Sequence, residues 1–89
     1  MSVRREVRIT NRRGLHARAS AKFVTLASSQ PTEITVETDG SRVTGTSIMG
    51  LMMLGAAMGD TIVISAEGDA ADEAVTALCS LVEDRFGEE

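Results

Sequence analysis

The order of strand and helix patterns along the chain predicts an α+β fold, with four strands and three helices in the order βαββαβα. Four segments alternate apolar and polar residues, which is typical of half-buried strands. Three segments repeat apolar residues at helical spacing, as amphipathic helices do. The dipeptide Asp39-Gly40 joins two strand segments and is a strong signal for a tight hairpin. We therefore expect one four-stranded sheet with its helices on one face, in a single domain that covers residues 1–89.

The first half of the chain contains three of the strands and one helix. Alternation predicts a first strand over residues 3–10. The apolar spacing then changes, which predicts a helix that begins at Ala17 and ends before Pro31. Alternation resumes over residues 33–38, and the hairpin signal predicts an antiparallel return strand over residues 41–44.

The second half contains two helices and the last strand. Ser47 is a natural N-cap for a short apolar helix that Gly55 ends. Residues 61–66 alternate as a fourth strand, and Asp69 is expected to cap the final helix. The predicted buried stripe of that helix consists of Ala71, Ala74, Val75, Leu78, Leu81 and Val82.

The composition excludes several classes of protein and of site. One His and one Cys are too few for a disulfide framework or a zinc site, so we expect neither a metal nor a cofactor. Aromatic residues make up 2% of the chain, which leaves almost nothing on which nucleic-acid bases could stack. The sequence has no apolar run of membrane length, and from its first residues we expect no signal peptide. Together with the lone Cys79, these observations predict a cytoplasmic protein that does not bind membranes.

The net charge of -4 hides an uneven distribution. Seven of the nine Lys and Arg residues fall in the first 22 positions, where Glu6 is the only acidic residue. This asymmetry suggests a bound anion or an acidic partner, although a solvated basic face would give the same pattern. Binding of nucleic acid by these arginines is disfavoured by the acidic total and the scarcity of aromatics.

His16, the single histidine, lies between a glycine-containing loop and the expected first helix. The first amides of a helix have no intrahelical acceptors, so an anion at His16 would meet the free N–H groups of Ala17 and Arg18. The Arg18 guanidinium can also bind two phosphate oxygens at once. A neutral imidazole is a competent nucleophile near pH 7. His16 could instead be an ordinary cap, but the combination indicates a phosphoryl site.

The neighbours of His16 in the sequence lack the groups that would hydrolyse a bound phosphoryl group. The chain has no second histidine, no Walker-type phosphate loop and no metal cluster, and we expect no carboxylate base near the His16 ring. Such a site favours a carrier of the phosphoryl group over a hydrolase, so we do not expect an enzyme.

Three runs of residues support a resemblance to a known family: 14–20 (Gly-Leu-His-Ala-Arg-Ala-Ser), 47–55 and 64–68. In sequence and spacing they closely resemble the HPr family, the phosphocarriers of the bacterial phosphoenolpyruvate-dependent phosphotransferase system. The resemblance extends over essentially the whole chain. It implies an open-faced β-sandwich, in which a four-stranded antiparallel sheet carries three helices on one side.

The resemblance also implies residue roles. His16 would accept a phosphoryl group on Nδ1 from enzyme I, the phosphoenolpyruvate-protein phosphotransferase, and pass it to an EIIA-type protein. Arg18 would steady the phosphate. The chain would then be a monomeric carrier with a transient phosphohistidine.

Ser47 matches the serine that HPr kinase/phosphorylase modifies in many family members, although a plain helix cap is the simpler interpretation. A phosphate there would place about two negative charges beside an apolar surface and oppose docking of an acidic partner. The apolar residues of the short helix cannot all face inward, so part of that helix is expected to form the surface. The residues expected to dock partners are Lys22, Ile48, Met49 and Met52, with Met53 beside them.

Two departures from the family pattern concern its branches. Ala19 stands where most members have Pro, and Arg13 stands where sugar-transport members commonly have Asn or Ser. Both resemble the nitrogen-regulatory branch. The alternative function is a binding module that Ser47 phosphorylation controls without carrier turnover; the presence of His16 and Arg18 argues against that as the only role.

Overall fold

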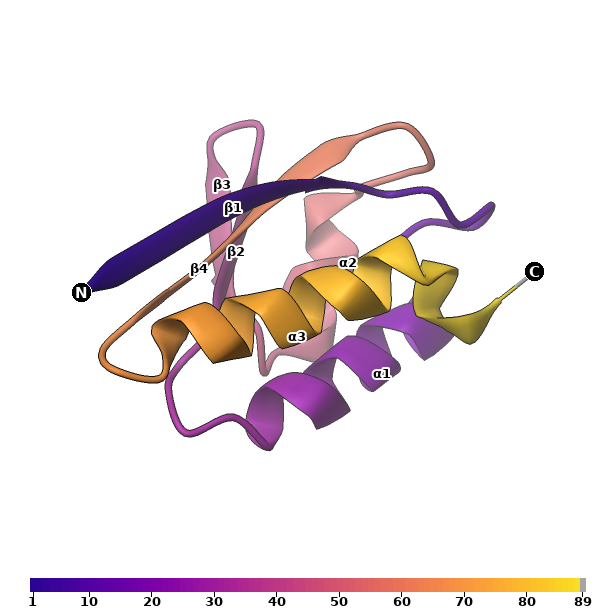
Figure 1. Ribbon diagram of the computed structural model, residues 1–89. Coiled ribbons are helices and arrows are strands. Elements are labelled where there is room, and N and C mark those ends of the chain that lie inside the picture. Colours follow the sequence, from indigo (N-terminus) through magenta and orange to yellow (C-terminus); the bar gives the residue numbers. More distant parts are fainter. Residues whose placement is uncertain (89) are drawn as a thin grey trace.

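The computed structural model describes residues 1–88 and contains one antiparallel sheet with the strand order β1-β4-β2-β3. Its elements are β1 (Ser2–Arg8), α1 (Ala17–Ser28), β2 (Thr35–Thr38), β3 (Ser41–Thr44), α2 (Ile48–Leu54), β4 (Thr61–Glu67), α3 (Ala71–Glu83) and the short turn η1 (Arg85–Gly87). Figure 1 shows the helices on one side of the sheet, with α1 and α3 side by side. The structure confirms the predicted α+β fold and element order.

The two faces of the sheet differ in chemistry, because its strands alternate. Val36 pairs with Ile64 on the helix side, and neither side chain is exposed. On the open side Arg4 lies opposite Ser65, and its guanidinium donates to the Glu37 carboxylate at 2.7 Å. One face therefore packs under the helices, and the other faces water.

The core is almost entirely aliphatic, as the composition predicts. Both phenylalanines are buried within it, Phe23 from α1 and Phe86 from η1. Phe86 therefore fixes the segment that follows the last helix against the rest of the molecule. The other large apolar side chains that are fully buried are Ile9, Ile34, Leu51, Ile62, Ile64, Leu78, Val36, Val75 and Val82.

The structure of α3 differs from the sequence-based prediction in its N-cap and in its buried stripe. Asp69 does not cap the helix: the N-cap is Ala70, without a side-chain hydrogen bond, and the Ala71 amide instead donates to the Gly68 carbonyl at 3.2 Å. Leu81 is only half-buried, and Cys79 lies in the stripe in its place. Burial, the main cause, raises the pKa of the Cys79 thiol, so the thiol belongs to the core.

Two further facts concern the helices and the polar side chains of residues 1–88. No helix in this part of the chain has the length and apolar character to cross a membrane. These residues also contain no group of three or more His, Cys, Asp or Glu side chains placed to hold a metal ion.

Candidate functional site

His16 occupies the N-cap position of α1, as the change in apolar spacing predicts. Its backbone is extended, with φ -73° and ψ 178°, and its carbonyl accepts the Ser20 amide at 2.8 Å. The imidazole makes no capping hydrogen bond, so the His16 side chain does not occupy the amides of the first turn. These amides, which include those of Ala17 and Arg18, have no intrahelical acceptors and remain available to an anion.

The loop before His16 is held at a fixed place by contacts with the segment that follows α2. The Leu15 amide donates to the Ala56 carbonyl at 3.0 Å, and the buried Ser20 hydroxyl donates to the Leu15 carbonyl at 3.2 Å. Gly14 lies in the left-handed region with φ 64°, and a Cβ there would stand 2.5 Å from the Ala56 oxygen. Only glycine fits this approach, which positions the histidine.

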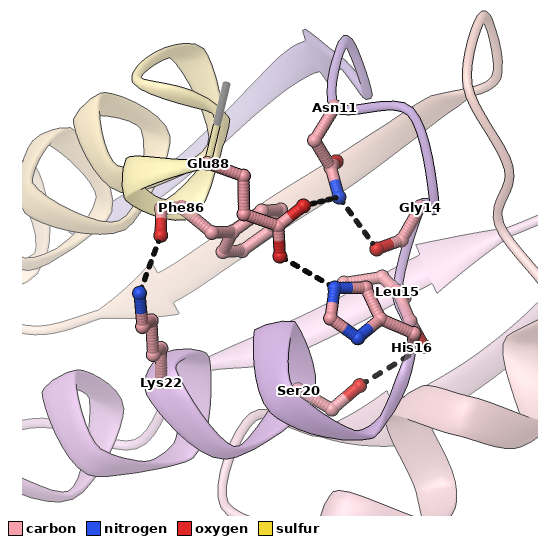
Figure 2. A network of polar contacts seen from close by, with 8 residues as sticks. All are labelled: Asn11, Gly14, Leu15, His16, Ser20, Lys22, Phe86 and Glu88. Atoms are coloured by element: carbon pink, nitrogen blue, oxygen red, sulfur yellow. Dashed lines mark hydrogen bonds and ion pairs between the residues drawn. The ribbon is translucent and has the colours of Figure 1, made fainter.

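A carboxylate contacts the His16 ring, and this overturns the prediction that none lies near it. Oε2 of Glu88 is 2.5 Å from Nε2 of His16. Figure 2 shows the Glu88 carboxylate and the His16 ring pointing toward each other. The two residues are 72 positions apart in the sequence, so only the folded chain brings them together. Their side chains are 13% and 21% exposed, so the pair is largely shielded from water.

Asn11 holds the other oxygen of the same carboxylate. Its Nδ2 donates to Oε1 of Glu88 at 3.2 Å and to the Gly14 carbonyl at 2.8 Å, although Asn11 is fully buried. The pKa of the Glu88 carboxyl lies below its ordinary value. The hydrogen bond to His16 is the main cause of this lowering. Burial acts in the opposite direction and raises the pKa, whereas the Asn11 hydrogen bond and the nearby charges of His16 and Lys22 lower it further.

Lys22, predicted to dock partners, also binds the C-terminal segment. Its Nζ donates to the Phe86 carbonyl at 2.8 Å. The Lys22 side chain thus spans from α1 to η1, as Figure 2 shows. Its ammonium group is held at the edge of the site rather than extended freely into water.

Three arginines surround the His16–Glu88 pair. An open depression of about 550 Å³ is lined by Arg12, Arg13, His16, Arg18 and Glu88. All three arginines are exposed, so their guanidinium groups can move to meet an incoming anion. The balance of charge in this depression is positive, which suits a doubly charged phosphoryl group.

The short helix α2 has an exposed apolar face, as predicted. Ile48, Met49, Met52 and Met53 are 41%, 69%, 42% and 79% exposed, whereas Leu51 is fully buried. Ser47 caps this helix, because its Oγ accepts the Gly50 amide at 2.9 Å. Since α1 packs against α2, this apolar face and the histidine belong to one part of the molecule.

Comparison with known proteins supports the resemblance found in the sequence. The family model described as the PTS HPr component phosphorylation site matches residues 3–84. The chain belongs to the HPr family. HPr of Cupriavidus necator is 42% identical over 97% of both chains, and the phosphocarrier protein NPr of Shewanella violacea is 43% identical over 94% of this chain and 92% of its own. The crystal structure of HPr from Thermoanaerobacter tengcongensis matches with a TM-score of 0.92, 46% identity and 98% coverage of both chains.

Membership of the HPr family makes this chain a phosphocarrier of the phosphotransferase system rather than a catalytic enzyme. The residues that sequence reasoning missed are Asn11 and Glu88, and Glu88 lies outside the range that the family model matches. The sequence does carry a signal that the chain turns back before Glu88, but it carries none for the contact with His16. Phe86-Gly87 after the last helix combines an apolar anchor with a turn residue, which is typical of a tail that folds back.

Proposed function

We propose that this HPr-family chain carries a phosphoryl group on Nδ1 of His16, accepts it from enzyme I and passes it to an EIIA-type protein. One observation carries the proposal: His16 stands at an uncapped helix start inside a basic depression, beside the apolar face of α2. The nucleophile, the anion site and a docking surface therefore adjoin.

The proposed transfer step needs few groups. The Nδ1 lone pair of His16 attacks the phosphorus of a phosphohistidine on enzyme I, the donor N–P bond breaks, and its electron pair stays on the donor imidazole. The amides of Ala17 and Arg18 and the Arg18 guanidinium would receive the phosphoryl oxygens. The same steps in reverse order deliver the group to an acceptor histidine.

The docking surface we propose for both partners is the exposed face of α2. Ile48, Met49 and Met52 supply flexible apolar contacts, and methionine suits a surface that meets more than one partner. Arg12, Arg13 and Arg18 line the depression at His16 and would steer an acidic partner toward it.

Labelling tests the carrier role directly. The chain is incubated with enzyme I and labelled phosphoenolpyruvate, and the acid-labile label is measured. We expect the wild type and Ser47→Ala to be labelled and His16→Ala to remain unlabelled. Equal labelling of His16→Ala, or none of the wild type, would contradict the proposal.

A second candidate function is regulation through Ser47 by an HPr kinase/phosphorylase. Ser47 is half-buried at the start of α2, directly before Ile48 and Met49 of the apolar face. A phosphate there would place about two negative charges beside the proposed docking surface and oppose an acidic partner. Mass spectrometry of cell extracts tests this role, because phosphoserine is stable in acid and phosphohistidine is not. Absence of phosphoserine under every growth condition would speak against it.

A further inference from the structure

We propose that Glu88 is a positioning residue for phosphoryl transfer: its carboxylate, clamped by Asn11, binds the Nε2 proton of His16 and so presents Nδ1 as the nucleophile. The inference rests on the proposed carrier role of His16. It assigns a function to the C-terminal segment, which lies beyond the residues that the family model matches.

The chemistry of the contact places the ring proton. An ionised carboxylate only accepts hydrogen bonds, so the His16 nitrogen that contacts Glu88 must donate. A neutral imidazole carries a single N–H, and with that proton on Nε2 the other nitrogen has a free lone pair. Figure 2 shows this second nitrogen on the side of the ring away from Glu88.

Asn11 fixes the orientation of the Glu88 carboxylate. Both of its partners, the Gly14 carbonyl and the carboxylate, are acceptors, so the side-chain NH₂ group must face them. Asn11 is fully buried, and its Oδ1 has no hydrogen-bond partner in the part of the chain that the structure describes. A buried amide with one unpaired oxygen is costly, so a function that uses its NH₂ group explains its presence better than packing does.

The path of the C-terminal segment supports a specific role for Glu88. Arg85 and Phe86 have φ values of 57° and 55°, a conformation that non-glycine residues rarely adopt. The buried Phe86 ring and the bond from Lys22 to the Phe86 carbonyl hold this turn in place. The turn reverses the chain after α3 and brings Glu88 over His16 (Figure 2). Strained backbone that is held in this way clusters at functional sites.

The carboxylate also stabilises the charge that transfer creates. When the Nδ1 lone pair forms the bond to phosphorus, the proton stays on Nε2 and the ring becomes positively charged. Glu88 then faces a cation, as the aspartate of a serine-protease triad faces its imidazolium. The negative charge of Glu88 would also repel the phosphoryl group, and Arg12, Arg13 and Arg18 in the same depression offset that repulsion.

The test combines a spectroscopic and a kinetic readout in four chains: the wild type, Glu88→Ala, Asn11→Ala and Glu73→Gln. Glu73 is an exposed acid in the first turn of α3, so its substitution controls for lost charge. NMR of the ¹⁵N-labelled proteins detects a His16 ring proton coupled to Nε2, whose exchange with water is slow only when a partner holds it. The rate of His16 phosphorylation by phosphorylated enzyme I is measured in parallel.

We expect the slowly exchanging Nε2 proton in the wild type and in Glu73→Gln, and its loss in Glu88→Ala. Asn11→Ala should speed its exchange, because the carboxylate loses its clamp. Phosphorylation of Glu88→Ala should be about tenfold slower than that of the wild type, the size of effect that a charged hydrogen bond gives. A protected proton or an unchanged rate in Glu88→Ala would overturn the inference. If the wild type accepts no phosphoryl group at all, the carrier proposal fails, but the proton signal still decides the role of Glu88.

Discussion

The N-terminal ends of α1 and α2 differ in whether a side chain satisfies their free amides. At α2, the Ser47 hydroxyl accepts the Gly50 amide at 2.9 Å, so a side chain of the protein satisfies the helix end. At α1, the His16 ring makes no cap and instead turns its Nε2 to Glu88. The first helix end is left open to an anion, and the second is closed.

The difference separates a binding end from a structural end. An open helix end forgoes the stability of a side-chain cap, which is typically about 1 kcal/mol. In return, its amides and its dipole are available to a ligand. The surroundings agree with this division, because three arginines line the depression at α1, whereas exposed methionines follow the cap at α2.

Two glycines test how tightly the open end is built. Gly14 before α1 and Gly55 after α2 have nearly the same φ, 64° and 68°, but only Gly14 has backbone atoms where a Cβ would lie. We expect Gly14→Ala to lower the free energy of unfolding by about 3 kcal/mol, because backbone strain and overpacking add. Gly55→Ala should cost about 1 kcal/mol from strain alone. Chemical denaturation measures both, and equal losses would show that the contact with Ala56 is unimportant.

Arg18 tests whether the open end binds the phosphoryl group. We expect Arg18→Ala to slow phosphorylation of His16 by about tenfold, or about 1.4 kcal/mol, through the lost charge-assisted hydrogen bond. Arg42 is an exposed arginine on β3, and Arg42→Ala serves as the control for net charge. Rapid-mixing kinetics with phosphorylated enzyme I compares the two variants. Equal rates would mean that the amides bind the group without the guanidinium.

Local patterns in the sequence predict most of the fold and half of the site. The Asp39-Gly40 hairpin, the Ser47 cap and the start of α1 all depend on neighbours in the chain, and all three are found. The sequence pattern predicts Asp69 as the cap of α3, but the Ala71 amide donates to the Gly68 carbonyl instead. A backbone partner of this kind leaves no mark in a sequence pattern.

The contact between Glu88 and His16 could not be predicted, because it joins residues 72 positions apart. It depends on a turn in which Arg85 and Phe86 adopt positive φ, and neither residue type signals that conformation. The acidic residues of the second half of the chain had no evident role in the sequence. One of them now has a partner at the site, and tertiary packing of Phe86 is what brings it there.

Ser47 tests the closed end. Ser47→Ala removes the hydroxyl that accepts the Gly50 amide, and we expect the free energy of unfolding to fall by about 1 kcal/mol. Ser47→Asp should keep most of the stability, because aspartate also caps helices. Denaturation curves of the three chains measure this. If Ser47→Ala is as stable as the wild type, then packing rather than the cap maintains the start of α2.

Acid titration tests whether the His16–Glu88 contact couples the start of α1 to the C-terminal segment. Of the changes predicted, we expect this change in stability to be the smallest. The pKa of the Glu88 carboxyl is held below its ordinary 4.5, first by the hydrogen bond to His16 and then by Asn11 and nearby positive charges. A carboxyl with a lowered pKa in the folded state stabilises the fold above its unfolded pKa, and this contribution is lost as pH falls through the folded pKa. The stability that the wild type has over Glu88→Gln should therefore be present at about pH 5 and fade in stronger acid.

A direct measurement distinguishes this coupling from a general charge effect. Carbon NMR of the Glu88 carboxyl should give a pKa closer to the ordinary value in His16→Ala than in the wild type, because the main cause of the shift is gone. Glu73→Gln, which removes a charge from the other end of α3, should leave the Glu88 titration nearly unchanged. If the Glu88 pKa is the same with and without the His16 ring, the carboxylate owes its shift to Asn11 and the cations. The open end of α1 would then be independent of the segment that covers it.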